Sequence, residues 1–589
     1  MRSALKEPPA KKVNARIRIL LAGLLAWAVL LAGRLVQLQV FGHAAAQAEV
    51  LEQSRSKSDI FPERGTIFDR TGQILARSIP ARSLFLTPVK GESAEAQRSK
   101  VRALNKALGL GEEETRRLLV RIRQAEPFLY LRRKVSPETA AAVESLKLPG
   151  VHSHPDTMRF YPNGPLAAHI LGGVGIDDTG LAGVEYSYNQ PLQGKKGQAI
   201  ILKDARRREY YFETLAAALP GKDIALTIDA TLQYIAEREL AKAVEASQAN
   251  WGTVIVSHPG SGEILAMASS PTYNPNAFSS AGADVQFNRA IQLTYEPGST
   301  FKIVTASAAL AHHAVGLRET FDCSRDDLGF PGKPIRDHKP FGILTFPEVV
   351  IHSSNRGMAQ VGRRVGQASL YDMAAAFGFG RKSGIDLAGE ASGRLQPLSA
   401  WSRRTLPALS TGYEVATTPL QVLQAINAVA NRGALIPPRI VNNIFDPAQP
   451  LKRRPPTVAL QVLPPEIAIT MAGILEEAVE EGTGRQARLD GYRIAGKTGT
   501  TQKWDPVLKA YSERKHIASF VGFAPADNPV LSVIVVLDEP KGTATYGGDV
   551  AAPVFREIVR KALLKLGIFP VTAPAKGLIT ASVWNEARR

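Results

Sequence analysis

The sequence predicts a mixed α/β (α+β) fold in which helices flank an antiparallel sheet. Two short apolar runs, 252–257 and 263–268, are separated by Pro259-Gly-Ser-Gly262 and predict a β-hairpin. A second strand pair is predicted at 518–524 and 531–537. Helical patterns fill the interval between the two strand pairs, which indicates one domain built around one sheet.

The remaining elements set the boundaries of that domain. A strand at 223–227 and an amphipathic helix at 231–246 open it, and a helix at 554–566 closes it. The intervening helices are predicted at 299–313, 369–377, 419–431 and 465–480. We therefore expect a domain over residues 222–568, followed by a tail at 569–589. The preceding region, 54–220, is charged and loop-rich, with short helical patches such as 112–124.

Length and composition limit the classes of protein. At 589 residues the chain has room for three or four domains of about 150 residues each. A single cysteine, Cys323, excludes an intramolecular disulfide and a cysteine-based zinc site, and we expect its thiol to be solvent-facing or half-buried. The net charge of +18 suits an anionic partner such as lipid or cell-wall polymer, and no nucleic-acid-binding motif accompanies it.

The N-terminus predicts a single membrane anchor. Residues 1–18 form a basic tail, and residues 19–33 contain no charge. Those fifteen residues would span roughly 22 Å as a helix, so the anchor must continue to residue 41 to cross a hydrocarbon core of roughly 30 Å. Basic flanks remain in the cytoplasm, so we expect the rest of the chain to be exported across a bacterial cytoplasmic membrane.

Two features of the anchor leave alternatives open. Ala46-Gln-Ala48 is typical of a signal-peptidase site, although it lies thirteen residues beyond Gly33. Arg34 and Gln37, at positions i and i+3, form a polar strip that lipid alone disfavours. Arg34 must either snorkel to the interface or face a partner helix.

The first of three chemical motifs is Ser299-Thr-Phe-Lys302 at the start of an apolar helix. A serine hydroxyl is a weak nucleophile, so a base must accept its proton. The i and i+3 positions of a helix share one face, which brings the Lys302 amine within reach of Ser299. Lys302 can act as that base only if burial or a nearby positive charge lowers its pKa.

The other motifs are Ser353-Ser-Asn355 and Lys497-Thr-Gly-Thr500, which follow 54 and then 144 residues later. Lys497 would supply the second positive charge, and the hydroxyls of Thr498 and Thr500 can bind a carboxylate. Gly499 would let an extended substrate lie against the strand edge. The backbone amides of Ser299 and Thr500 are candidates for an oxyanion hole.

Each short motif also occurs elsewhere by chance, as Ser54-Arg-Ser-Lys57, Ser187-Tyr-Asn189 and Lys382-Ser-Gly384. Order and context distinguish the selected set, because together they make the S-x-x-K, S-x-N, K-T-G series of β-lactamases and penicillin-binding proteins.

With these motifs the chain resembles the class B penicillin-binding proteins, which are monofunctional peptidoglycan D,D-transpeptidases. The resemblance extends through Arg64-Gly-Thr-Ile-Phe-Asp-Arg70, Gly180-Leu-Ala-Gly-Val-Glu185, Thr418-Pro-Leu-Gln421 and the segment 546–555. It implies a penicillin-binding transpeptidase domain on an elongated, dimerisation-type pedestal domain. Ser-Ser-Asn and the Y-G-G-x-x-A-A-P-V-F ending resemble the division-specific branch, while an elongation-specific role stays open.

The resemblance also implies a mechanism that needs no metal or organic cofactor. Ser299, deprotonated by Lys302, would attack the penultimate D-alanine of a stem peptide, and Ser353 would relay a proton to the leaving amine. Asn355 would hold the substrate amide. An amine from a second stem peptide would then complete the cross-link, and β-lactams would acylate Ser299. The implied partners are a polytopic glycan polymerase and other division proteins, with no nucleic acid.

Three other functional classes remain as alternatives. A carboxypeptidase or β-lactamase would need a base that activates water, and the sequence identifies none. A non-catalytic scaffold would be expected to have lost a motif, and a β-lactam sensor would need a cytoplasmic or multi-span signalling module.

Overall fold

The computed structural model describes residues 10–41, 55–87, 89, 91–124, 126, 128–203, 209–325, 329, 334–446, 458–507 and 509–571. The chain divides into two units, residues 1–62 with 195–219, and residues 63–194 with 220–589. The candidate cleavage site at 46–48, the first residue of the expected pedestal and most of the expected tail lie outside the described residues.

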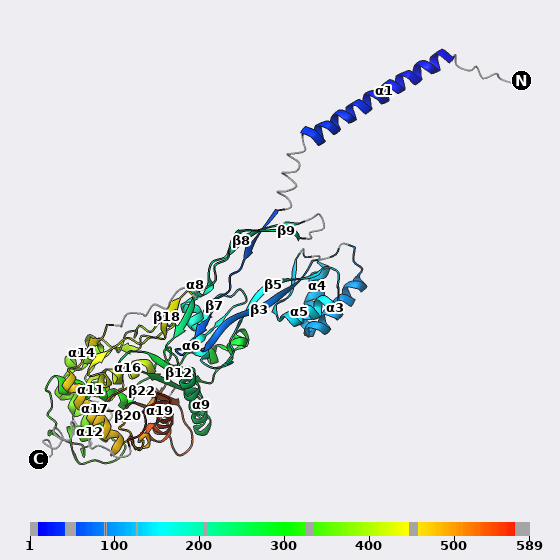
Figure 1. The fold of residues 1–589 in the computed structure, drawn as a ribbon. Coiled ribbons are helices and arrows are strands. Elements are labelled where there is room, and N and C mark those ends of the chain that lie inside the picture. The colour runs from blue at the N-terminus through cyan, green and yellow to red at the C-terminus, as the bar shows by residue number, and fades with distance from the viewer. Residues whose placement is uncertain are drawn as a thin grey trace. The chain divides into compact units, whose positions relative to one another are not determined.

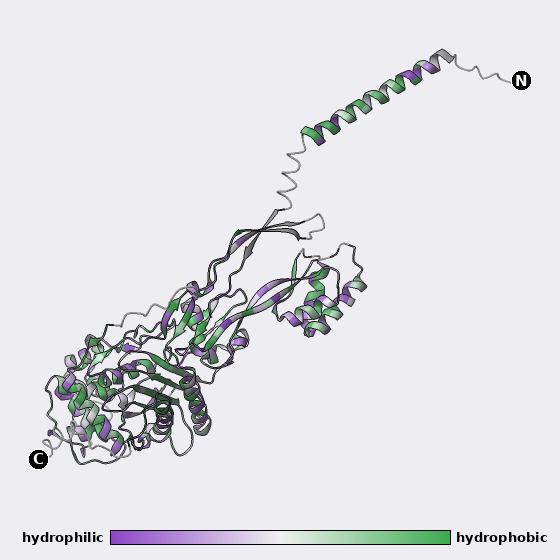
Figure 2. Ribbon diagram, in the orientation of Figure 1, coloured by the Kyte–Doolittle hydropathy of each residue, from purple (hydrophilic) through white to green (hydrophobic). Residues whose placement is uncertain are grey.

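The first unit contains the expected membrane anchor. Helix α1 (Ala10–Val36) continues as a π-helical turn, η1 (Gln37–Phe41), and residues 14–41 are long and apolar enough to cross a membrane. Figure 2 shows hydrophobic residues along successive turns of α1. Arg34 Nη1 donates to Gln37 Oε1 at 2.8 Å. The unit also contains an antiparallel sheet of β1 (Arg55–Ile60), β8 (Gly197–Lys203) and β9 (Glu209–Ala216), in the order β1-β8-β9.

The second unit begins with a sheet covered on one face by three helices (Figure 1). Strands β3 (Ile74–Leu86), β4 (Leu129–Val135) and β5 (Val151–Phe160) are antiparallel, with β3 between the other two. The covering helices are α3 (Ala94–Leu108), α4 (Glu112–Arg123) and α5 (Pro137–Ser145). Alternation along β3 buries Leu84 and Leu86 against these helices. The predicted helix at 112–124 is confirmed as α4.

This pedestal sheet also includes strands from distant parts of the sequence. Strand β2 (Ile67–Phe68) pairs with β3 and, in parallel, with β10 (Asp223–Leu226). Strand β10 in turn pairs with β18 (Val441–Phe445). The strand that we expected to open the catalytic domain therefore belongs to the pedestal sheet, and β18 comes from the middle of the catalytic region.

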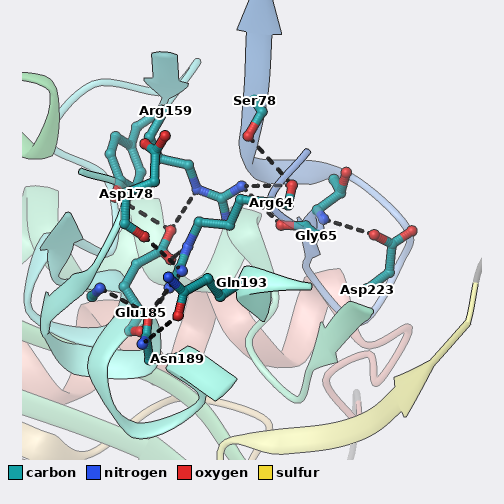
Figure 3. Close-up of polar contacts among 12 residues, drawn as sticks. Arg64, Gly65, Ser78, Arg159, Asp178, Glu185, Asn189, Gln193 and Asp223 are labelled. Atoms are coloured by element: carbon teal, nitrogen blue, oxygen red, sulfur yellow. Dashed lines mark hydrogen bonds and ion pairs between the residues drawn. The ribbon is translucent and has the colours of Figure 1, made fainter. Parts of the chain in front are cut away.

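A buried ion-pair cluster joins two of the pedestal motifs (Figure 3). Arg64 Nε and Arg159 Nε each donate to a different carboxylate oxygen of Glu185, both at 2.6 Å. Arg64 also donates to the Asp178 carbonyl and to Asn189 Oδ1. All three charged side chains are buried, so removing Glu185 would leave two arginines away from water without their carboxylate partner. The cluster explains structurally why the motifs at Arg64 and Glu185 occur together in this chain.

The catalytic sheet has five antiparallel strands in the order β12-β11-β22-β21-β20. Its strands are β11 (Trp251–Ser257), β12 (Ile264–Ser270), β20 (Ala495–Asp505), β21 (Ala510–Ala524) and β22 (Leu531–Asp538). Helices α9 (Ala230–Ser247) and α19 (Ala552–Lys565) pack in one apolar cluster with the sheet. Helices α11 (Lys302–Ala311), α16 (Pro419–Ala430) and α17 (Pro465–Glu480) belong to the second cluster. The predicted α/β class and its flanking helices are confirmed.

The other elements are short. The helices are α6 (Ala168–Leu171), α7 (Gly183–Ser187), α8 (Asn189–Gln193), α10 (Ala283–Gln286), α12 (Phe346–Ile351), α13 (Asn355–Val365), α14 (Gln367–Ala376), α15 (Thr405–Ser410) and α18 (Gly547–Val550), with 3-10 turns η2 (Pro275–Ser280), η3 (Gly298–Phe301), η4 (Leu398–Ala400) and η5 (Arg485–Ala487). The strands are β6 (Gly173–Val174), β7 (Gly180–Ala182), β13 (Thr320–Asp322), β14 (Ile343–Thr345), β15 (Arg394–Leu395), β16 (Val415–Ala416), β17 (Ala434–Leu435) and β19 (Leu460–Gln461).

Candidate active site

Ser299 lies in the 3-10 turn η3, immediately before α11, rather than inside the α-helix that we expected to begin at 299. The turn packs directly against the edge strand β20. Gly298 has φ +55°, and a Cβ at this position would lie 2.2 Å from Thr501 Oγ1. Only glycine fits both the left-handed backbone and this close approach. The turn thus places a partly exposed serine beside β20.

Lys302 begins α11, and its side chain is fully buried. Its Nζ donates to the Ser353 carbonyl at 2.7 Å and to Asn355 Oδ1 at 2.7 Å, and lies 3.3 Å from Ser353 Oγ. Burial lowers the pKa of Lys302 to about 7, although the nearby Asp337 opposes the shift. A lysine with this pKa is partly neutral near pH 7 and can accept a proton.

Lys497 approaches the same serine from β20. Its Nζ donates to Ser353 Oγ at 2.9 Å, and its side chain is also fully buried. Burial, and then the charge of Lys302, lower the pKa of Lys497 well below its ordinary value. A second amine lies near Lys302, as expected, and its role as a positive charge stays a prediction. Burial, and not Lys497, lowers the pKa of Lys302.

Ser353 occupies a strained turn between α12 and α13. Its φ is +60°, which is uncommon for a residue other than glycine. Ser354 then caps α13, accepting a hydrogen bond from the Gly357 amide at 3.0 Å, and Asn355 is the first residue of the helix. The turn and the cap together direct Ser353 Oγ and Asn355 Oδ1 to the two lysine amines.

The remaining predicted residues lie along β20, which is the edge strand of the sheet. Thr498 Oγ1 is 2.7 Å from Thr483 Oγ1, and Thr500 Oγ1 accepts from the Gly547 amide at 3.0 Å. At Gly499, an added Cβ would lie 2.3 Å from Ser519 Oγ. Packing within the domain is thus one structural reason for a glycine at 499, and the role of Gly499 beside an extended substrate stays a prediction.

The Ser299 hydroxyl is the one catalytic group of the prediction that stands apart from this network. Within the described part of the chain, no hydrogen bond from its side chain is observed. Ser299 lies on η3 and Thr500 on β20. These elements are in contact, since a Cβ at Gly499 would also lie 3.0 Å from Thr300 Cγ2 of η3. The roles of Ser299 and Thr500 as nucleophile and oxyanion donors stay predictions.

Two neighbours of the site were not foreseen, and one expectation was wrong. Asp337 binds the start of α13, and Thr483 pairs with Thr498. Neither contact leaves a local signal in the sequence, because each joins segments fifteen or more residues apart. Cys323, expected to be exposed or half-buried, is fully buried, and a Cβ at Gly357 of α13 would lie 3.1 Å from its sulfur. Among the described residues, no group of three or more histidine, cysteine or acidic side chains is arranged to hold a metal.

Comparisons with known proteins agree with this arrangement. A family model described as the penicillin binding protein transpeptidase domain matches residues 252–560, and one described as the penicillin-binding protein dimerisation domain matches residues 59–226. The chain is 37% identical over 536 residues to stage V sporulation protein D of Bacillus subtilis, covering 90% of this chain and 81% of that protein. It is 32% identical over 571 residues to the peptidoglycan D,D-transpeptidase FtsI of Escherichia coli, covering 96% and 94%.

Solved structures of similar fold extend the comparison. Penicillin binding protein 3 of Mycobacterium tuberculosis, in complex with aztreonam, has a TM-score of 0.68 and 27% identity, covering 88% of this chain and 99% of that one. A peptidoglycan synthetase of Bifidobacterium adolescentis has a TM-score of 0.70 and 26% identity, covering 89% and 98%.

Proposed function

Because the chain belongs to the penicillin-binding proteins that join a dimerisation domain to a transpeptidase domain, we propose that it is a peptidoglycan D,D-transpeptidase acting through Ser299. The observation that carries the proposal is the hydrogen-bonded group of Lys302, Ser353, Asn355 and Lys497. Three separate segments contribute to this group, and Ser299 lies three residues before one of its lysines.

The reaction proceeds by acyl transfer. Ser299 Oγ attacks the carbonyl carbon of the penultimate D-alanine while its proton passes to neutral Lys302. Backbone amides of Ser299 and Thr500 stabilise the oxyanion. The tetrahedral intermediate collapses, the peptide C–N bond breaks, and the terminal D-alanine leaves as a free amine after receiving a proton. The acyl-enzyme then reacts with an amine of a second stem peptide, which restores Ser299.

Ser353 is suited to carry the proton to the leaving amine. Its hydroxyl is in contact with both lysines, at 3.3 Å and 2.9 Å. Two ammonium groups this close repel each other in a buried site, which disfavours both being charged at once. A single proton shared between Lys302 and Lys497 through Ser353 can therefore leave Lys302 and reach the departing amine. Asn355, bonded to Lys302 through Oδ1, would orient the substrate amide.

A hydrolase would require a base that activates water at the acyl-enzyme. Asp337 is a carboxylate beside Lys302, but its oxygens accept hydrogen bonds from Ser354 and from backbone amides of α13. Both carboxylate oxygens are therefore already occupied by protein donors rather than directed at a water molecule, which favours transfer to an amine over hydrolysis.

We place the activity in septal wall synthesis, with the catalytic domain outside the cytoplasmic membrane. The Ser353-Ser-Asn355 motif and the similarity to FtsI support division over elongation. The basic residues that precede the uncharged stretch 19–33 support an inside N-terminus. A fluorescent fusion expressed at native level should concentrate at mid-cell, and uniform labelling of the side wall would favour the elongation role.

The membrane helix would also contact a partner, for which a polytopic glycan polymerase of the division machinery is the best candidate. Arg34 and Gln37 bond to each other at 2.8 Å, and a polar pair within an apolar helix suits a helix–helix interface. Substituting both with leucine should reduce co-purification of the polymerase, whereas Gln39→Leu should not. Unchanged co-purification would leave Arg34 as an interfacial snorkelling residue.

Labelling with a fluorescent penicillin tests the activity itself. The wild-type chain should be labelled. Ser307→Ala is the control and should also be labelled, because Ser307 Oγ is buried without a hydrogen-bond partner among the described residues, so its loss breaks no contact. Ser299→Ala should not be labelled. Intact mass over time then separates a stable adduct, expected for a transpeptidase, from one that decays within minutes, expected for a hydrolase. Absence of any adduct would indicate a non-catalytic scaffold.

A further inference from the structure

Residues 335–337 form hydrogen bonds with residues 354–356, where the motif Ser353-Ser-Asn355 leads into α13. Asp337 Oδ2 accepts from Ser354 Oγ at 2.7 Å. Asp337 Oδ1 accepts from the backbone amides of Asn355 and Arg356, the latter at 3.2 Å. These amides belong to the first turn of a helix, where no intrahelical acceptor exists and a negative charge is favourable. Asp337 therefore fixes the exact start of α13 from outside the helix.

The same segment also sets the orientation of the Asn355 side chain. Asn355 Nδ2 donates to the Arg336 carbonyl at 2.8 Å, and Asn355 Oδ1 accepts from Lys302 Nζ at 2.7 Å. The amide nitrogen of Asn355 is therefore bound to a backbone acceptor, and its oxygen is bound to the Lys302 amine. A rotation that exchanged Oδ1 and Nδ2 would place two donors against each other at Lys302.

The contacts of Asp337 matter for the site because they adjoin the strained backbone turn at Ser353. A left-handed backbone at a residue other than glycine is strained and persists only where neighbouring contacts impose it. Ser353 precedes the two residues that Asp337 holds, and its carbonyl is held by Lys302. Without Asp337, the turn would lose its anchor on the helix side.

We propose that Asp337 is a positioning residue for acyl transfer: by holding Ser354 and Asn355, it keeps Ser353 Oγ between the two lysines and Asn355 Oδ1 on Lys302. The inference rests on the proposed roles of Ser299 and Lys302. It assigns Asp337 no contact with the substrate and no part in water activation.

Asp337 has a second influence, through its charge. The titratable groups in electrostatic contact with Lys302 are Lys497 from β20, Cys323 after β13, and Asp337 with its neighbour His338. Of these, Asp337 and Cys323 raise the pKa of Lys302. Neutralising Asp337 should therefore lower the pKa of Lys302. In a plot of acylation rate against pH, the fall in rate on the acid side (the acid limb) should then occur at lower pH. A residue that only stabilised the fold would not produce that shift.

The test compares Asp337→Asn with Asp322→Asn in the detergent-solubilised full chain. Asp322 is a matched control because, among the described residues, its carboxylate accepts hydrogen bonds only from the amide and hydroxyl of Ser324, at 2.9 Å and 2.5 Å. The second-order rate of acylation by penicillin is measured from pH 5.5 to 8.5, together with Tm. For Asp337→Asn we expect a plateau rate at least tenfold lower and an acid limb at lower pH. Asp322→Asn should match the wild type.

Ser354→Ala provides an independent variant with no change of charge. It removes the Ser354 hydroxyl donor and should slow acylation several-fold without moving the acid limb. If Asp337→Asn does not fold, this variant decides: a wild-type rate in Ser354→Ala overturns the inference. A wild-type plateau and limb in folded Asp337→Asn also overturn it. If the wild-type chain is not acylated at all, or Ser299→Ala is acylated equally, the proposed function fails instead.

Discussion

Lowering the pH should switch off acylation through the protonation of Lys302. With a pKa of about 7, set mainly by burial, the neutral fraction of this lysine is about 0.9 at pH 8, half at pH 7 and about 0.03 at pH 5.5. Because only the neutral amine can accept the proton of Ser299, the acylation rate should fall about 30-fold between pH 8 and pH 5.5. An ordinary lysine, with a pKa near 10.4, would instead be almost fully charged throughout this range.

The assay is the second-order rate of penicillin acylation at constant ionic strength, with circular dichroism at each pH to confirm the fold. His338 is the nearby group that could imitate the effect, since its pKa is lowered by burial and it lies within electrostatic reach of both lysines. The limb should therefore persist in His338→Ala. A rate that is constant from pH 5.5 to 8 would refute the assignment of Lys302 as the base. A rate that rises tenfold per unit up to pH 9 would refute its lowered pKa.

Three substitutions test other parts of the structure. Glu185→Ala leaves two buried arginines without their carboxylate partner and should lower the free energy of unfolding by about 3–5 kcal/mol, measured by thermal or urea unfolding. The control Glu113→Ala removes only exposed ion pairs and should lower it by less than about 1 kcal/mol. Equal losses in the two variants would contradict the argument. Gly298→Ala places a Cβ 2.2 Å from a threonine hydroxyl and should abolish penicillin labelling, whereas Gly282→Ala, with nothing within 4 Å, should label normally. Lys302→Met should remove labelling but raise Tm at pH 7. Between about pH 7 and 10.5 the unfolded chain keeps a proton on this lysine that the folded chain holds only partly, so the buried lysine destabilises the fold. A lower Tm would argue that the lysine is stabilising.

Local patterns in the sequence predicted most of the catalytic domain. The helix predicted at 465–480 is observed as α17 with the same bounds, and the hairpin at 252–268 is observed as β11 and β12. Both rest on hydrophobic periodicity and turn residues that lie within the element itself. The three motifs likewise depend on short spacings, and the structure brings Lys302, Ser353, Asn355 and Lys497 together.

Features that depend on contacts between distant segments could not be read in this way. The strand at 223–226 joins the pedestal sheet because its partners are β2 and β18, which no local pattern identifies. Cys323 follows a short strand in a polar stretch, yet α13 covers it. Asp337 resembles any loop aspartate until the start of α13 is placed beside it. Sequence periodicity reports which face of an element is apolar, but not which element covers it.

The pairing of β10 with both β2 and β18 has a consequence for how the chain is made. Residues 67–68 and 223–226 are synthesised early, but their sheet is complete only after residues 441–445 have followed. Until then β10 presents a free edge, which is a site for mispairing. Truncation after the dimerisation-type region would leave that edge permanently open, so a well-behaved fragment for biochemistry must extend past residue 445.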